Sequence, residues 1–143
     1  EALTYLPHEY TKTQEILRIH KKHLKGLLEL QLPSGMWTQV LNFDGSYQEL
    51  SSTCMIGYAL AKGIRLGWLD SEFIPALKKS WSAVSKRIDD QANLVDVCTG
   101  TGTQARMQDY FYRKAENGYD DRGGSMSIWF ATEIEQCYRT LNS

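Results

Sequence analysis

Apolar residues recur at three- and four-residue spacing over four long stretches of the chain, and this period is typical of α-helices. We expect helices at about residues 10–32, 51–66 and 71–88, and a fourth from about residue 125 to residue 141. A short apolar segment before Pro7 is typical of the last turn of a further helix, since proline commonly follows a helix end. This segment indicates a piece of a longer chain, and a processed terminus is the alternative.

Hydrophilic side chains that can cap a helix stand near three of these starts. Ser51 or Ser52 is expected to cap the second helix, Asp70 the third and Ser125 the fourth, because such oxygens accept hydrogen bonds from free backbone N–H groups. Two shorter runs, residues 36–41 and 94–97, have the pattern of strands, with a turn at Asp44-Gly45. We expect these two strands to pair with each other, because an isolated strand is unstable.

The second and third helices differ in their surfaces. The second carries small residues at near-alternate positions, so it can approach its neighbours closely and is expected to be an inner helix. The third has one apolar and one cationic face, which is typical of an outer helix. The resulting order of outer helix, strand, inner helix, outer helix, strand with loop, and inner helix indicates an all-α fold of the α/α-barrel type. A four-helix bundle is the competing architecture.

Composition excludes several classes of function. A length of 143 residues is enough for one domain with a core, and a hydrophobic fraction of 42% is ordinary. The net charge of −1 offers no basic field for nucleic acid or an anionic membrane. No apolar run approaches the ~20 residues of a membrane-spanning helix. Cys54, Cys98 and Cys137 lie far apart, which predicts reduced thiols and a cytoplasmic location; an upstream start would leave secretion open.

A loop of threonines and glycines follows the second predicted strand, at residues 97–104 (VCTGTGTQ). Glycine lets a ligand approach the backbone closely, and threonine hydroxyls both donate and accept hydrogen bonds. Three rings follow at residues 110–112 and offer flat apolar faces with polar tips. These features suit one wall of a site for a small polar ligand such as a sugar. From these residues alone, a surface turn beside a core aromatic patch is the favoured interpretation.

Two further features allow weaker hypotheses. His20 and His23 could hold a metal, but no Asp, Glu or Cys stands at ligand spacing, so solvated or core-edge histidines are favoured and no metal is expected. The fourth helix follows Gly123-Gly124, and its free N–H groups could bind an anion. Many helices start in this way without binding anything.

Several segments resemble glycoside hydrolase family 105, the unsaturated rhamnogalacturonyl hydrolases, which are related to the family 88 unsaturated glucuronyl hydrolases. The segments are residues 35–41 (GMWTQVL), 47–53 (YQELSST), 58–67 (YALAKGIRLG), 97–102 (VCTGTG) and 109–112 (DYFY). They stand in the family's order over nearly the whole chain. The resemblance implies an (α/α)6 toroid, of which residues 1–143 form the C-terminal portion of a single catalytic domain. This portion corresponds to about two helical hairpins with short strand-bearing loops.

The resemblance also implies an activity. These enzymes remove a 4,5-unsaturated uronic acid from pectin-derived oligosaccharides: an aspartate protonates the double bond, and water adds at C5. No cofactor is required, and the implied partners are the unsaturated oligosaccharide and the remaining N-terminal part of the barrel. The catalytic aspartate of the family lies upstream of Glu1, so no residue here is expected to be catalytic. Glu49 precedes a helix start and is expected to interact with it.

The resemblance places one wall of the cleft in this chain. The substrate-binding residues that it implies are Thr99, Gly100, Thr101, Gly102, Asp109, Tyr110, Phe111 and Tyr112, with Trp37 and Gln39 as weaker candidates. Trp37 is alternatively a core residue. A non-catalytic helical module that binds sugars or another protein on the same scaffold is the second hypothesis, and the length of the natural gene product would discriminate between the two.

Overall fold

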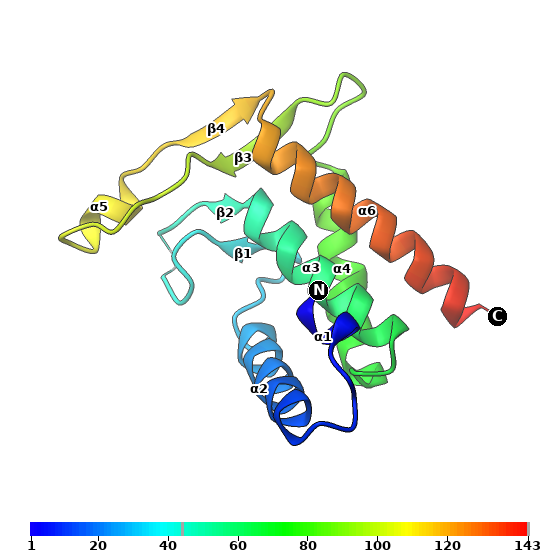
Figure 1. Cartoon of the computed structure of the whole chain (residues 1–143). Coiled ribbons are helices and arrows are strands. Elements are labelled where there is room, and N and C mark those ends of the chain that lie inside the picture. Colours follow the sequence, from blue (N-terminus) through cyan, green and yellow to red (C-terminus); the bar gives the residue numbers. More distant parts are fainter. Residues whose placement is uncertain (44, 143) are drawn as a thin grey trace.

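The longest helix of the chain, α6 (Asp121–Leu141), packs along α3 (Leu50–Arg65) at the centre of the molecule (Figure 1). The computed structural model describes residues 1–43 and 45–142. Helix α4 (Ile74–Ser85), which follows the 3₁₀ turn η1 (Ser71–Phe73), packs on another side of α3. Helix α3 is therefore enclosed by two long helices, as expected for an inner helix, and the lysines of α4 face solvent.

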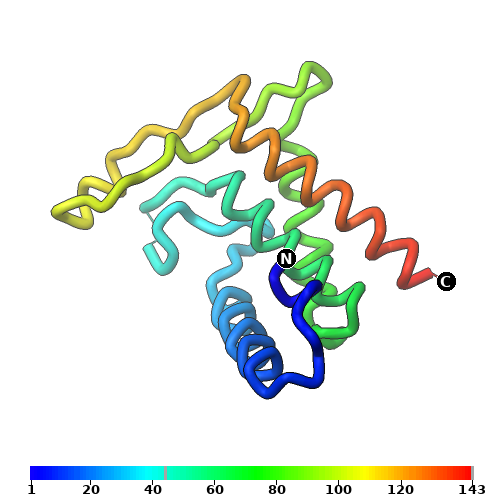
Figure 2. Tube along the Cα trace, in the orientation of Figure 1, coloured from blue at the N-terminus to red at the C-terminus, as the bar shows by residue number. Residues whose placement is uncertain are grey.

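The N-terminal region adds two helices. The single turn α1 (Ala2–Tyr5) has the position expected for the end of a helix and contacts α2 (Thr11–Leu28). Figure 2 shows the N-terminus against the body of the molecule and the C-terminus at the free end of α6. Helix α2 ends four residues earlier than expected, because the Gln31 side chain donates hydrogen bonds to the carbonyls of Gly35 and Ala76 and turns the chain toward α4.

The strands pair differently from our expectation. Strand β1 (Trp37–Thr38) forms an antiparallel hairpin with β2 (Gln48–Glu49), and β3 (Leu94–Cys98) pairs with β4 (Ala115–Gly118). The predicted pairing of residues 36–41 with 94–97 is therefore wrong. Each strand instead pairs with the next one along the chain, which closes a shorter loop. The predicted turn at Asp44-Gly45 lies partly outside the described residues.

Strand β3 contains a bulge. The register with β4 shifts by one residue between Leu94 and Val97, and Asp96 inside the bulge has a φ of 62°. The extra residue lets Leu94 and Val97, three positions apart, both lie in the core. Beyond the bulge, the segment between β3 and β4 projects from the helices as an arm that carries the short helix α5 (Gln108–Phe111) (Figure 1).

Two of the three predicted helix caps are wrong, and the third, Asp70, has the N-cap position but makes no side-chain capping bond. Helix α3 is capped by Glu49, whose carboxylate accepts from the backbone N–H groups of Ser51 and Ser52. Asp70 precedes η1 without a side-chain cap. Helix α6 begins at Asp121 rather than near residue 125, because the Asp120 carboxylate accepts from Gly123 N at 2.6 Å. In α3 and α6, the capping side chain is therefore an acidic residue that precedes the serine we expected, by two residues in α3 and by five in α6.

The core lies between α3, α4, α6 and the strands. Trp37, Phe73 and Phe130 are its largest fully buried side chains, and the Trp81 ring meets Phe130 edge to face at 5.3 Å between ring centroids. Gly57 on α3 faces the Phe130 ring, and a Cβ at that position would overlap it. The absence of a side chain at Gly57 therefore sets how closely α3 and α6 approach.

Candidate functional site

An open pocket of about 520 Å³ lies where the first turn of α3 meets the loops that follow β1 and β3. Its lining residues come from seven elements or loops, namely Gln39, Glu49, Ser51, Ser52, Met55, Cys98, Thr101, Tyr110 and Met126. Three of them, Gln39, Thr101 and Tyr110, are residues that we expected to contact substrate. Among the described residues that line this pocket, only Glu49 carries a formal charge near neutral pH.

Glu49 forms the floor of the pocket beside the start of α3. Only 2% of its surface is exposed, and its carboxylate accepts from Ser51 N at 2.8 Å, Ser51 Oγ at 2.7 Å and Ser52 N at 2.5 Å. It also accepts from Cys98 N, at the end of β3, at 2.9 Å. The expected interaction of Glu49 with the helix start is confirmed, and its contact with β3 is additional.

The threonine–glycine loop is held by its backbone. Arg122 Nη1 donates to the Thr99 carbonyl at 2.9 Å, and the guanidinium lies against Gly100, whose φ is 82°. A side chain at Gly100 would strain the backbone and meet Arg122. Thr101 turns inward, with its Oγ1 at 3.5 Å from Cys98 Sγ, while Gly102 lies exposed and its carbonyl accepts from the Gln104 side chain.

Tyr110 separates this pocket from a second, shallower one of about 490 Å³. The second pocket is lined by residues 39–41 and 104–107 together with Tyr110. The Tyr110 hydroxyl accepts from Gln104 N at 2.9 Å, which fixes the phenol between the two. Gln39 also lines both pockets. Tyr110 and Gln39 are therefore the two expected residues that both spaces share.

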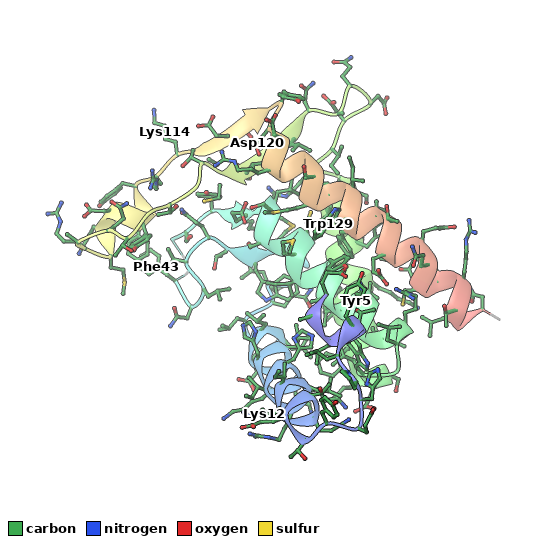
Figure 3. The ribbon with its side chains drawn as sticks, in the orientation of Figure 1. Tyr5, Lys12, Phe43, Lys114, Asp120 and Trp129 are labelled. Atoms are coloured by element: carbon green, nitrogen blue, oxygen red, sulfur yellow. The ribbon has the colours of Figure 1, made fainter. Side chains whose placement is uncertain are left out.

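The other expected residues lie away from the pockets. Trp37 is fully buried and its indole N–H donates to the Leu27 carbonyl at 2.7 Å, so it is the core residue that we kept as an alternative. Asp109 forms a 3.0 Å ion pair with Arg106 on the arm. Phe111 stacks on Phe43 of the preceding hairpin, with 3.8 Å between ring centroids. Figure 3 shows Phe43 close to the arm. Tyr112 is 83% exposed.

Two buried polar atoms at this pocket have no hydrogen-bond partner among the described residues. They are Gln39 Oε1 and Ser52 Oγ, and both residues line the pocket. Nearly all buried polar atoms in folded proteins are paired, so unpaired ones at a pocket wall indicate where a ligand or water completes the bonding. Burial raises the pKa of the neighbouring Tyr47 phenol, helped by the Cys98 thiol beside it, so the phenol stays neutral.

Sequence reasoning did not assign six of the nine lining residues to the site, namely Glu49, Ser51, Ser52, Met55, Cys98 and Met126. The two methionines, Met55 and Met126, lie on helix faces that periodicity alone assigns to the core. Cys98 and Ser52 reach the pocket through the junction of β2, α3 and β3. The available signal was a glutamate two residues before Ser51-Ser52-Thr53, at a predicted helix start.

The structure also shows the surroundings of the two histidines and of the start of α6, for which we gave weaker hypotheses. His20 is partly buried, and this burial, with His23 nearby, lowers its pKa. Among residues 1–43 and 45–142, no group of three His, Cys, Asp or Glu side chains could hold a metal ion.

The anion that we considered at the start of α6 is supplied by the chain itself, as Asp120 occupies that helix end. In the described part of the chain, no helix is long and apolar enough to span a membrane.

Paired inner and outer helices with a pocket at their loop end are typical of the α/α-barrel class of proteins. The family model described as Glycosyl Hydrolase Family 88 matches residues 1–138, and the chain belongs to that family. The expected relationship to families 105 and 88 and the expected all-α fold, part of an α/α toroid, are confirmed, and the four-helix bundle is not supported.

Two solved structures of family 105 have the same fold. A possible family member from Salmonella enterica serovar Paratyphi A matches with a TM-score of 0.86 and 22% identity, over 93% of this chain and 35% of that chain. A family 105 glycoside hydrolase from C. acetobutylicum matches with a TM-score of 0.83 and 23% identity, over 93% and 41%. The 24.9 kDa protein in the picA locus of Rhizobium radiobacter is 36% identical over 75 residues, which is 50% of this chain and 32% of that relative.

Proposed function

We propose that this chain is the C-terminal part of a glycoside hydrolase that removes a 4,5-unsaturated uronic acid from pectin-derived rhamnogalacturonan oligosaccharides. Family membership supports a glycosidase, and the resemblance of several segments to family 105 supports the choice of substrate. The chain covers 35% of the Salmonella structure that it matches, so the rest of the barrel would come from another part of the same protein. A cytoplasmic location belongs to the same proposal.

The observation that carries the proposal is the pair of unpaired buried atoms at the pocket. Gln39 Oε1 needs a donor, and Ser52 Oγ can donate or accept. Sugar hydroxyls supply both kinds of partner. The Tyr110 ring beside them offers a flat face of the kind on which a sugar ring packs. An unsatisfied buried polar group costs about 1–3 kcal/mol, which a bound hydroxyl would recover in part.

The reaction is a hydration of the C4=C5 double bond. A carboxylic acid protonates the double bond, water adds at C5, and the resulting hemiketal rearranges so that the glycosidic bond breaks. We assign no residue of this chain to the proton transfer. Asp109 pairs with Arg106, Asp120 caps α6, and Asp96 pairs with Arg87 at 2.5 Å. The role proposed for this chain is to bind the sugar along one wall of the cleft.

The test uses the purified chain and unsaturated digalacturonate. We expect titration of the ¹⁵N-labelled chain to shift the amide signals of residues 98–102 and 110, while the ultraviolet absorbance of the double bond stays constant. Loss of that absorbance would show that the chain alone is catalytic. Unmoved amide signals would contradict the assignment of the pocket. The non-catalytic module becomes the better description if the natural gene product ends at these 143 residues and still binds the sugar.

A further inference from the structure

We propose that Glu49 is a positioning residue that holds the threonine–glycine loop, residues 99–102, over the first turn of α3. The ligand-binding consequence of this proposal rests on the proposed function, because it takes the pocket as the sugar site. Its structural consequence stands independently. Glu49 contacts both walls of the pocket, and these walls come from chain segments 49 residues apart.

The two carboxylate oxygens of Glu49 accept different numbers of hydrogen bonds. Oε1 accepts three hydrogen bonds, from Ser51 N, Ser51 Oγ and Cys98 N. Oε2 accepts one, from Ser52 N. The Cys98 bond reaches the last residue of β3, directly before the loop. One side chain therefore fixes the start of α3 and the start of the loop relative to each other.

The backbone of Glu49 is itself held firmly. Thr53 Oγ1 donates to the Glu49 carbonyl at 2.7 Å and accepts from Trp37 N at 3.1 Å. A separate bridge joins β2 to β3, in which Arg87 Nη1 donates to the Gln48 carbonyl and to Asp96. Because this bridge does not involve Glu49, loss of the Cys98 bond leaves β3 attached and releases only its end and the loop that follows.

Two conservative substitutions separate the capping role from the positioning role. Aspartate is a favoured N-cap, so Glu49→Asp keeps the bonds to the first turn of α3. Its side chain is one methylene shorter, and it draws the carboxylate away from Cys98 N. Glu49→Gln keeps the length, and its single carbonyl oxygen is placed best at the position that accepts three bonds. Its amide nitrogen cannot accept from Ser52 N, so this variant weakens the cap and keeps the Cys98 bond.

The experiment measures amide hydrogen exchange at Cys98, the melting temperature, and the dissociation constant for unsaturated digalacturonate. For Glu49→Asp we expect exchange at Cys98 to rise tenfold or more and binding to weaken at least fivefold, with little change in melting temperature. For Glu49→Gln we expect a lower melting temperature, an exchange rate at Cys98 that rises no more than global unfolding does, and a smaller loss of sugar affinity than in Glu49→Asp. Glu133→Asp is the matched control, since Glu133 is 5% exposed and bridges α6 to Arg65 of α3, away from the pocket.

Several outcomes would overturn the proposal. Unchanged Cys98 exchange in Glu49→Asp would show that the carboxylate does not hold the loop. If sugar affinity falls in parallel with melting temperature in both Glu49 variants, or in Glu133→Asp, Glu49 has a structural role only. If the wild-type chain does not bind the probe, the proposed function fails, while the exchange at Cys98 still decides whether Glu49 positions the loop.

Discussion

At the scale of single residues, Tyr110 has the most direct part in the candidate site. Its ring lines both pockets, and its hydroxyl oxygen accepts a hydrogen bond from the backbone N–H of Gln104. The ring and the hydroxyl therefore have separable roles. The ring would pack on a sugar, whereas the hydroxyl fixes the loop after Gly102.

We expect Tyr110→Ala to weaken binding of unsaturated digalacturonate at least tenfold, about 1.4 kcal/mol, because it removes the packing face. Tyr110 is only half-buried, so the melting temperature should change little. Tyr110→Phe keeps the ring and is the control, with affinity expected within about threefold of wild type, since a typical hydrogen bond contributes about 0.5–1.5 kcal/mol. Titration followed by NMR and thermal unfolding measure both quantities. A lower melting temperature with unchanged affinity would make Tyr110 a structural residue.

Residue types alone predicted only part of the site. Thr101, Tyr110 and Gln39 could be nominated because hydroxyls, amides and rings in loops are typical of sugar sites. Trp37 has the same chemistry, and nothing in the sequence shows that its indole is fully buried. The contact of Glu49 with Cys98 depends on the pairing of strands far apart in the chain, which local patterns do not determine.

At the scale of elements, the helices were predicted well, but the side chains that cap α3 and α6 were not. Periodicity follows side-chain burial and so located α3 and α6 within a few residues. The residue that caps a helix depends on where the backbone turns into the helix. At the start of α6, both Asp120 and Ser125 could act as the N-cap. The Asp120 carboxylate prevails because Gly123 fits closely into the core, and a Cβ there would lie 2.8 Å from Val97.

The cap of α6 predicts a pH dependence of stability. The Gly123 N–H bond, with help from Arg122, holds the pKa of Asp120 below the ordinary value of 3.8. The folded state thus binds a proton more weakly than the unfolded state. The stabilisation is complete above the unfolded pKa and is lost as pH falls through the folded pKa.

We expect Asp120→Asn, which keeps a capping oxygen, to be less stable than wild type by about 0.3–1 kcal/mol near neutral pH, because it loses the charge at the helix start. The difference should stay constant above about pH 5 and shrink below about pH 4. Urea unfolding at several pH values measures it. Asp90→Asn, at an exposed position, is the control and should show no such trend. If the difference in unfolding free energy between wild type and Asp120→Asn does not vary with pH, the charge of Asp120 does not account for the stabilisation.

At the scale of the whole molecule, stability depends on how closely the inner helices approach. Gly57 lets Phe130 of α6 lie directly on α3. Helix α6 also carries exposed apolar side chains: Ile128 is 67% exposed, and Trp129, which lies beside Tyr58 of α3, is 52% exposed. Figure 3 shows Trp129 on α6. In the proposed function, the remaining part of the barrel covers these side chains.

We expect Gly57→Ala to destabilise the chain by about 1–3 kcal/mol, because the fully buried Phe130 ring cannot move aside. Gly26→Ala is the matched control: Gly26 lies in α2 with no atom within 4 Å of the added methyl, so it should gain up to about 1 kcal/mol. Chemical denaturation with urea gives both values. A stabilising Gly57→Ala would mean that helix propensity outweighs packing at this contact.

The bulge in β3 limits how this segment can change in length. In a regular strand, side chains alternate between faces, so residues three apart point to opposite sides. The extra residue cancels that alternation and brings both Leu94 and Val97 onto Gly123 of α6. Substitutions at the exposed Val95 leave this arrangement intact, whereas deletion of a single residue would reverse every position after it. Cys98 N would then point away from Glu49, so the number of residues in β3 matters more to the pocket than the identity of its exposed members.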